Sequence, residues 1–197
     1  MYGLAACGEF GIEPALRACT NDHWGVRKSA AFVLGEIAMY RDDVVTTLAT
    51  IVKDDINDEV RAAALTSISR IARKNLCTNP TIIDALIDAI VPGVDLVIEI
   101  GRSKIPMNRV QQASALCVLT IVTAAIEAKI IDQPLERLAD VTIEIAYLGN
   151  DRYAVGTAIE TAKRLAEAGV NKAISATLSI LSLDRWTPSP EVPSVER

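Results

Sequence analysis

The amino-acid sequence predicts an all-α protein, an α-solenoid of about four helix pairs followed by a C-terminal capping helix. Two segments beginning at Asn21 and Asn57 read as copies of each other at an offset of 34 residues, from Val26 to Val60. Short helices that alternate with long ones at a period of about 34–50 residues are typical of solenoids. The chain is 50% hydrophobic and only 4% aromatic, which fits close stacking of helices through small aliphatic side chains.

Within each copy the apolar residues fall on one face of a helix. Counted from Val26 or Val60, they recur at i, i+4, i+8, i+11 and i+12, a spacing that marks one side of an α-helix. Two weaker copies follow, with Val110 and Ala154 at the valine position. The predicted helices are, in chain order, Ile12–Cys19, His23–Tyr40, Asp43–Lys53, Asp58–Lys74, Thr81–Val91, Asn108–Lys129, Pro134–Leu148, Asp151–Ala168 and the capping helix Lys172–Leu183.

Polar residues and prolines mark the starts of these helices. Asn-Asp pairs precede the long helices at Asn21, Asn57 and Asn150, where a short side-chain oxygen can accept a hydrogen bond from a first-turn N–H group. A proline suits the first turn because its missing N–H costs nothing there. The short helices begin near Pro14, Pro80 and Pro134, or at the acidic pair Asp42–Asp43 in the second copy.

Residues 1–185 are expected to form one continuous solenoid, since each repeat in such an array contacts only its neighbours. Residues 92–107 form an insertion relative to the first two copies, and within it residues 94–100 read either as a helical turn or as a short strand. Residues 186–197 contain three prolines and predict an extended tail, with a proline-rich ligand motif as the alternative.

The copies resemble HEAT repeats, specifically the short variety found in phycobilisome-lyase-like proteins. The resemblance is clearest over residues 21–75, and weaker in the later copies, where Gln111 and Val155 stand at the arginine position. It implies a right-handed array whose second helices line a concave surface. The residues that carry it are Val26, Arg27, Ala30, Ala31, Leu34, Gly35, Ile37, Val60, Arg61, Ala63, Ala64, Ile68 and Ile71.

The resemblance also implies a structural role for Arg27 and Arg61, which occupy equivalent positions in neighbouring copies. In HEAT arrays an arginine at this position pairs with an acid of the adjacent unit and builds an internal ladder. The planar guanidinium group suits this role because it donates several bonds to a carboxylate. Asp22, Asp55 and Asp58 are the expected partners, and a ligand-binding role is the less favoured alternative.

Charge and cysteine content narrow the class of partner. The net charge of −5 disfavours nucleic acid, because duplex binding usually needs a basic surface. The four cysteines show no CxxC spacing and read as free thiols in a reducing cytosol.

No signal peptide is evident, and the longest apolar run, Ala113–Ile126, is too short to span a bilayer. A cytoplasmic protein without membrane contact is expected.

No catalytic or metal-binding pattern stands out. His23 is the only histidine and lies at a helix start, which favours a surface or capping role. HEAT-repeat iron hydroxylases carry several His-Glu pairs as metal ligands, and this sequence contains no such pair. The acids Glu136, Asp140 and Glu144 repeat along one helical face and read as a solvated surface. We therefore expect no enzymatic activity, metal or cofactor.

The charges are segregated, since acids concentrate on the short helices and bases on the long helices and adjoining turns. One interpretation is a concave groove of positive character; the other is that several arginines are internal. Four glutamates on the long helices, Glu36, Glu127, Glu160 and Glu167, weaken the first interpretation. The groove candidates are Arg70, Arg73, Lys74, Arg109 and Arg152.

The function expected from these features is a non-enzymatic protein-interaction scaffold that binds a protein or peptide, possibly an acidic one, in the concave groove. One alternative is a phycobilin-lyase-like accessory protein. A second is a HEAT-like DNA-binding or glycosylase-like protein, which the acidic pI of about 5.0 disfavours. The partner and the oligomeric state stay open at this level.

Overall fold

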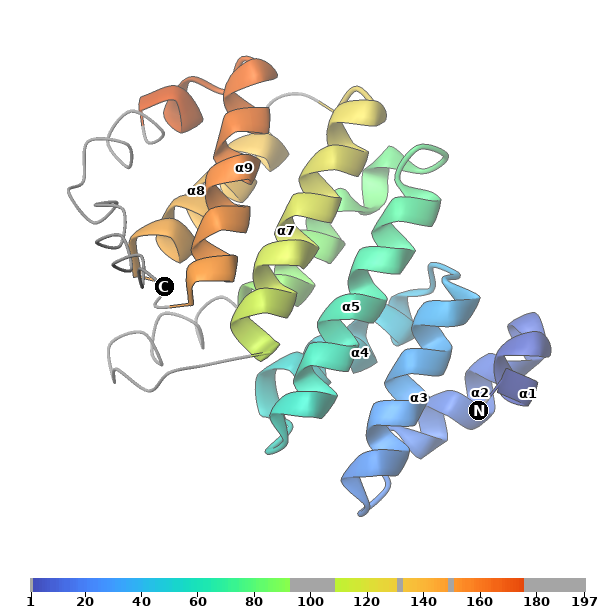
Figure 1. Ribbon diagram of the computed structural model, residues 1–197. Helices are drawn as coiled ribbons and strands as arrows, with labels where there is room; N and C mark the ends of the chain where they lie inside the picture. The colour runs from blue at the N-terminus through green and yellow to red at the C-terminus, as the bar shows by residue number, and fades with distance from the viewer. Residues whose placement is uncertain (1, 93–108, 131–132, 149–150, 176–197) are drawn as a thin grey trace, which may run out of the picture.

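The computed structural model describes residues 2–92, 109–130, 133–148 and 151–175, and every regular element in these ranges is helical (Figure 1). The prediction of an all-α protein is therefore confirmed. Most of the predicted insertion at 92–107, the tail at 186–197 and residues 176–183 of the predicted capping helix lie outside the described residues.

The helices occur at nearly the predicted places. They are, in chain order, α1 (Tyr2–Ala6), the 3₁₀ helix η1 (Gly8–Gly11), α2 (Ile12–Ala18), α3 (Trp24–Ile37), α4 (Asp42–Asp54), α5 (Asp58–Asn75), the 3₁₀ helix η2 (Pro80–Ile82), α7 (Arg109–Glu127), α8 (Gln133–Leu148) and α9 (Arg152–Glu167). Residues 83–92 and 171–175 are also helical.

The helices lie in two layers (Figure 1). The B layer consists of α3, α5, α7 and α9, which stand side by side and pack against one another in that order. The A layer lies behind it and consists of α2, α4, the helix over 83–92 and α8. Within the pairs, α2 packs on α3, α4 on α5 and α8 on α9.

Positions matched by the repeat pattern have equivalent places in the core. Val60 of α5, Val110 of α7 and Ala154 of α9 are each completely buried. The exception is Val26 of α3, which is 39% exposed. The alignment of the weaker later copies therefore identified side chains that are buried in corresponding turns of α5, α7 and α9.

The predicted polar starts act as N-caps in two of the B-layer helices. The side chain of Asn57 accepts a hydrogen bond from the N–H of Glu59 at the start of α5, and Asp151 accepts one from Ala154 at the start of α9. In α3 the cap is His23, whose Nδ1 accepts from the N–H of Gly25 at 3.1 Å. The surface or capping role predicted for the only histidine is confirmed, since His23 is exposed and caps α3.

Helix α3 ends earlier than its apolar pattern predicts. The expected end was Tyr40, but α3 stops at Ile37, and Ala38 adopts a left-handed conformation with φ 49°. The N–H of Ala38 still bonds to the carbonyl of Leu34, which satisfies one of the last carbonyl groups of the helix. The chain then turns from the B layer into α4 of the A layer.

Helices α3 and α5 approach each other closely at Gly35 and Ser67. A Cβ atom placed on Gly35 would lie 2.7 Å from both Cα and Cβ of Ser67. The Ser67 hydroxyl donates to the carbonyl of Ala31 in α3 at 2.7 Å and is also within 2.8 Å of the carbonyl of Ala63 in its own helix. The glycine is thus required by the distance between two helix backbones rather than by a turn.

Among the described residues, α7 is the one helix with the length and apolar character to cross a membrane. Its neighbours are α5, α8 and α9, and 56% of its most apolar window is buried among them. A helix buried on several sides is expected to be apolar around most of its circumference.

Candidate functional site

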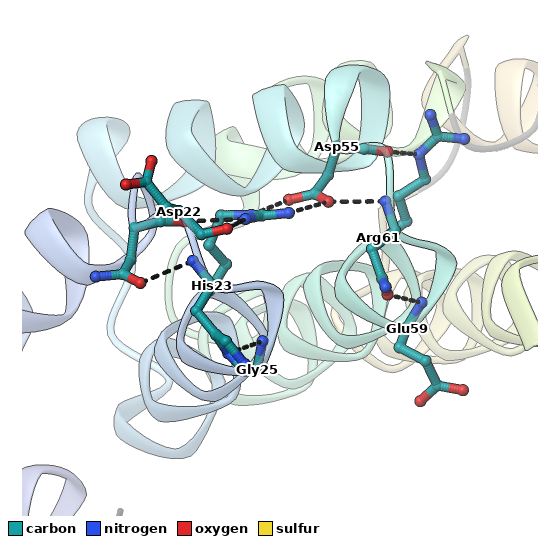
Figure 2. Close-up of polar contacts among 9 residues, drawn as sticks. Asp22, His23, Gly25, Asp55, Glu59 and Arg61 are labelled. Carbon is teal, nitrogen blue, oxygen red and sulfur yellow. Dashed lines mark hydrogen bonds and ion pairs between the residues drawn. The ribbon is translucent and has the colours of Figure 1, made fainter.

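Figure 2 shows polar contacts among Asp22, Asp55 and Arg61 near the N-terminal ends of α3 and α5. They belong to a ladder along the B-layer helices that begins at Arg27. Its Nε donates to Oδ2 of Asp55 at 2.7 Å and its Nη2 to Oδ1 of the same carboxylate at 2.9 Å. Its Nη1 donates to the backbone carbonyls of Asn21 and Asp22, both at 2.9 Å. One guanidinium group therefore joins the segment before α3 to the segment before α5.

Asp55 is shared between successive helices. Its carboxylate also accepts from the N–H of Asn57 at 2.9 Å, and its backbone carbonyl accepts from Nε of Arg61 (Figure 2). The side chain of Asp55 is only 5% exposed. Burial alone raises the pKa of this carboxyl, but the bonds from Arg27 and Asn57 outweigh it and hold the pKa below its ordinary value.

A second set of contacts continues the ladder to α7 and α9. Glu59 of α5 pairs with Lys28 of α3 at 2.7 Å and with Arg109 of α7 at 2.5 Å. Its pKa is lowered, chiefly by the hydrogen bond from Lys28. Nε2 of Gln112 in α7 donates to Asp151 at the start of α9 at 3.1 Å. All four B-layer helices are therefore joined through polar side chains near their N-terminal ends.

The third copy departs from the arginine pattern. Gln111 takes the position of Arg27 and Arg61, and its side chain is completely buried. Neither its Oε1 nor its Nε2 has a hydrogen-bond partner in the described part of the chain, and the same holds for Oγ of Ser114 one turn later. The link between α7 and α9 is made by the neighbouring Gln112 instead.

Trp24 lies beside the ladder at the start of α3. Its ring stacks on that of His23 with 6.1 Å between centroids, and Nζ of Lys28 lies 5.9 Å from the indole. Because Lys28 also pairs with Glu59, the indole contacts a side chain that links α3 to α5. Trp24 is 44% exposed, so one side of this cluster is open to solvent.

The five groove candidates have different surroundings. Arg70 pairs with Glu36 and lies over the ring of Phe32 at 4.7 Å, and Arg109 pairs with Glu59. Lys74 donates to the backbone carbonyl of Ile37 at 3.0 Å. These three side chains connect neighbouring helices. The other two candidates, Arg73 and Arg152, are exposed and form no ion pair within the described ranges.

Arg73 contributes to a pocket on the exposed face of the B layer. This B-layer pocket has a volume of about 350 Å³ and lies between α5, α7 and α9; it is lined by Arg73, Leu119, Thr120, Thr123, Ala124, Glu127 and Arg164. Arg73 enters it from α5 and Arg164 from α9. The pocket therefore brings together two arginines that are far apart in sequence.

The polar groups of the B-layer pocket differ in their availability. The hydroxyls of Thr120 and Thr123 donate to backbone carbonyls one turn earlier in α7, both at 2.8 Å. Arg164 donates to Oγ1 of Thr123 at 3.3 Å and pairs with Glu160 at 3.2 Å. Arg73 and Glu127 form no ion pair within the described residues, so they are the pocket's available cation and anion.

The sequence patterns single out Arg73 as a groove candidate but do not connect it with Arg164. The repeat alignment matches Arg164 with Arg70 rather than with Arg73, because Arg164 follows Ala154 by the same interval that separates Arg70 from Val60. Equivalent positions in successive B-layer helices face the same side of the layer. The pairing of Arg164 with Arg73 in one pocket depends on the spacing between α5, α7 and α9.

The cysteines fall into two classes. Cys19 and Cys117 are buried, and burial raises the pKa of Cys19 to about 11 and that of Cys117 further still. Cys7 and Cys77 are exposed. Across the described ranges, no group of three or more His, Cys, Asp or Glu side chains is arranged to hold a metal ion.

No family model matches the chain, and no curated protein matches it. Among solved structures it is similar to the crystal structure of an engineered protein, Northeast Structural Genomics Consortium target OR329. The two are 20% identical, with 86% of this chain and 78% of that chain covered and a TM-score of 0.41. A likeness of this size defines neither a shared fold nor a function.

Proposed function

We propose that the chain is a right-handed α-solenoid of HEAT-like helix pairs and that it serves as a non-enzymatic scaffold for a polypeptide. The alternation of A-layer and B-layer helices and the matched buried positions Val60, Val110 and Ala154 support this arrangement. In such an array the second helices line the concave side, which here is the exposed face of the B layer. The polypeptide lies across this face.

The observation that carries the proposal is that Arg73 lines a pocket without forming an ion pair in the described ranges. Neighbouring bases on the same layer already have internal partners, whereas the Arg73 guanidinium faces a pocket of about 350 Å³ and has no ion pair in the described ranges. A guanidinium group binds a carboxylate with two parallel hydrogen bonds. Arg73 is therefore the anchor for an acidic side chain of the partner.

Apolar residues on α7 supply the other half of the surface. Leu119 lines the pocket, and Leu116, one turn earlier, is 41% exposed. Glu127 adds a negative charge to the lining of the same pocket. A partner segment that fits has an acidic residue for Arg73, an apolar residue for the leucines and a basic residue near Glu127. Complementary charge of this kind sets the register of a bound segment.

The proposal narrows the predicted groove set. Arg70, Lys74 and Arg109 connect neighbouring helices, as does Arg27 in the ladder, whereas Arg61 bonds to the backbone carbonyl of Asp55 just before its own helix. Arg73 is the arginine assigned to the partner, together with Leu119 and Glu127 of the same pocket. Arg152, at the first turn of α9, is exposed but lies outside the pocket, which makes it the matched control.

The test uses purified chain and a library of displayed random peptides, with enriched sequences resynthesised for affinity measurement. We expect enrichment of segments that combine acidic and apolar residues. Arg73→Glu should weaken their binding at least tenfold, and Arg152→Glu should change it less than twofold, with both variants equally helical by circular dichroism. Equal loss in the two variants, or peptides that bind Arg73→Glu as well as the wild type, would overturn the assignment.

A further inference from the structure

A second hollow lies in the opposite layer of the molecule, between α4 and the helix over 83–92. This A-layer groove has a volume of about 360 Å³ and is lined by Tyr40, Asp42, Val45, Thr46, Ala49, Ala85, Asp88 and Ala89. It shares no residue with the B-layer pocket. Its occupant is therefore independent of the function proposed for that pocket.

Small side chains create the A-layer groove. Ala49 extends from α4 and Ala85 from the helix over 83–92, and neither side chain is long enough to fill the space between the two helices. Val45 and Ala89 are 5% and 2% exposed and form its floor. The result is a trench whose exposed lining is mainly apolar, open to solvent along one side of the A layer.

Carboxylates stand on both walls of this trench. Asp42 lies at the start of α4 and accepts a hydrogen bond from the Tyr40 hydroxyl at 2.7 Å. Asp88 lies on the helix over 83–92 and pairs with Arg137 of α8. Arg137 also pairs with Asp84 at 2.7 Å, so one base is shared by two acids. The trench is therefore electronegative.

The same sign extends over the neighbouring A-layer surface. Helix α4, the helix over 83–92 and α8 each have more acidic than basic residues. Ion pairs occur in both layers, but in the B layer α3, α5 and α9 each have more basic than acidic residues. A partner attracted to the A layer is therefore a basic one.

We propose that the A-layer groove docks a lysine or arginine side chain from a basic helix of a partner protein. Such a side chain has an apolar stem and a cationic head, and the stem covers the alanine floor while the head reaches a carboxylate on the wall. A wholly apolar side chain would remove the carboxylates from water without compensation. A short cation would reach a carboxylate without covering the floor.

The need for an apolar stem between backbone and cation can be tested directly by changing the length of the side chain. The probes are two soluble alanine-based helical peptides that have the same charges, one with lysines in a row at i, i+4 and i+8 and the other with diaminopropionic acid at these positions. Each is titrated into isotopically labelled protein and followed by NMR. We expect shifts of the backbone amides of residues 42–49 and 84–90, with at least fivefold tighter binding of the lysine peptide.

Matched variants separate the groove from general surface charge. Ala49→Met fills the trench without changing charge and should weaken binding of the lysine peptide at least fivefold. Thr46→Met does the same from an exposed position, in case the substitution at residue 49 disturbs folding. Glu144→Gln removes an acid from the same layer outside the groove and should change binding less than twofold.

Three results would overturn the inference. One is equal affinity for the lysine and diaminopropionic acid peptides, which would indicate attraction to charge alone. Another is unchanged binding in folded Ala49→Met and Thr46→Met. The third is a set of shifted amides that lies outside residues 42–49 and 84–90. A failed search for B-layer peptides would leave each of these measurements unaffected, because the two sites share no lining residue.

Discussion

Replacing Gly35 by alanine tests the close contact between α3 and α5. The added Cβ would lie 2.7 Å from Cα and Cβ of Ser67, well inside the 3.4–4 Å of ordinary van der Waals contact. Because one of these atoms is backbone, relief requires α3 and α5 to move apart. That movement also stretches the 2.7 Å hydrogen bond from Ser67 to the carbonyl of Ala31.

The magnitude follows from these two effects. Overpacking in a core costs about 1–3 kcal/mol, and loss of a buried hydrogen bond costs about 1–3 kcal/mol. Alanine is intrinsically better in a helix than glycine by about 1 kcal/mol, which offsets part of the loss. We expect Gly35→Ala to lower the free energy of unfolding by about 3 kcal/mol and the urea midpoint by about 1–2 M.

Gly156 of α9 is the matched control, because a Cβ placed there meets nothing within 4 Å. Gly156→Ala should raise the free energy of unfolding by about 0.5–1 kcal/mol through helix propensity alone. Urea unfolding followed by circular dichroism at 222 nm measures both variants. A shift of the same sign in the two proteins, or an unchanged midpoint for Gly35→Ala, would refute the close approach of α3 and α5.

Two further predictions concern titratable groups. The pKa of Asp55 lies below its ordinary value in the folded state, so its contribution to stability is present above about pH 4 and is lost as the pH falls through the folded-state pKa. Urea midpoints measured from pH 7 to pH 2.5 should therefore fall less steeply below pH 4 for Asp55→Asn than for the wild type, and parallel curves would contradict this. For the thiols, a maleimide at neutral pH should label Cys7 and Cys77 in the folded protein, and Cys19 and Cys117 only after unfolding; intact-mass measurement showing rapid labelling of all four would contradict the burial.

The all-α class and the places of the helices could be predicted because apolar spacing reflects burial directly. Val60, Val110 and Ala154 are in equivalent buried positions. Their burial could be predicted from apolar spacing without knowing which helices they contact. The end of α3 could not be predicted in this way. Ala38 takes a left-handed conformation that glycine usually adopts, and its sequence has no glycine or proline to mark the stop.

The candidate site was harder, because it depends on contacts between helices. Arg70 appeared to be a free base on a long helix, yet it pairs with Glu36. The two residues are 34 apart, which is the repeat offset, so they occupy the same position in adjacent helices. Sequence reasoning sought arginine partners in the loops and overlooked equivalent positions of neighbouring helices, which side-by-side packing brings together.

The B-layer pocket and the A-layer groove could not be predicted from the sequence for a related reason. A pocket exists where side chains fail to fill a space, and that space is set by the separation of helix axes. Ala49 and Ala85 look like ordinary helix-forming residues in the sequence, and only their positions on facing helices make them the lining of a groove. Arg73 and Arg164 are likewise separated in sequence and meet around α7.

The surroundings of Trp24 give the molecule a built-in optical reporter. An indole emits differently as nearby imidazole and ammonium groups approach or withdraw, and here these groups are the His23 ring and Lys28. Lys28 is held by Glu59, which is held in turn by Arg109. Trp24 and Lys28 are both on α3, so a loosening between α3 and α5 breaks the pair of Lys28 with Glu59 and frees the ammonium group to change its position relative to the ring. The emission of Trp24 should therefore respond to the integrity of contacts that extend to α7.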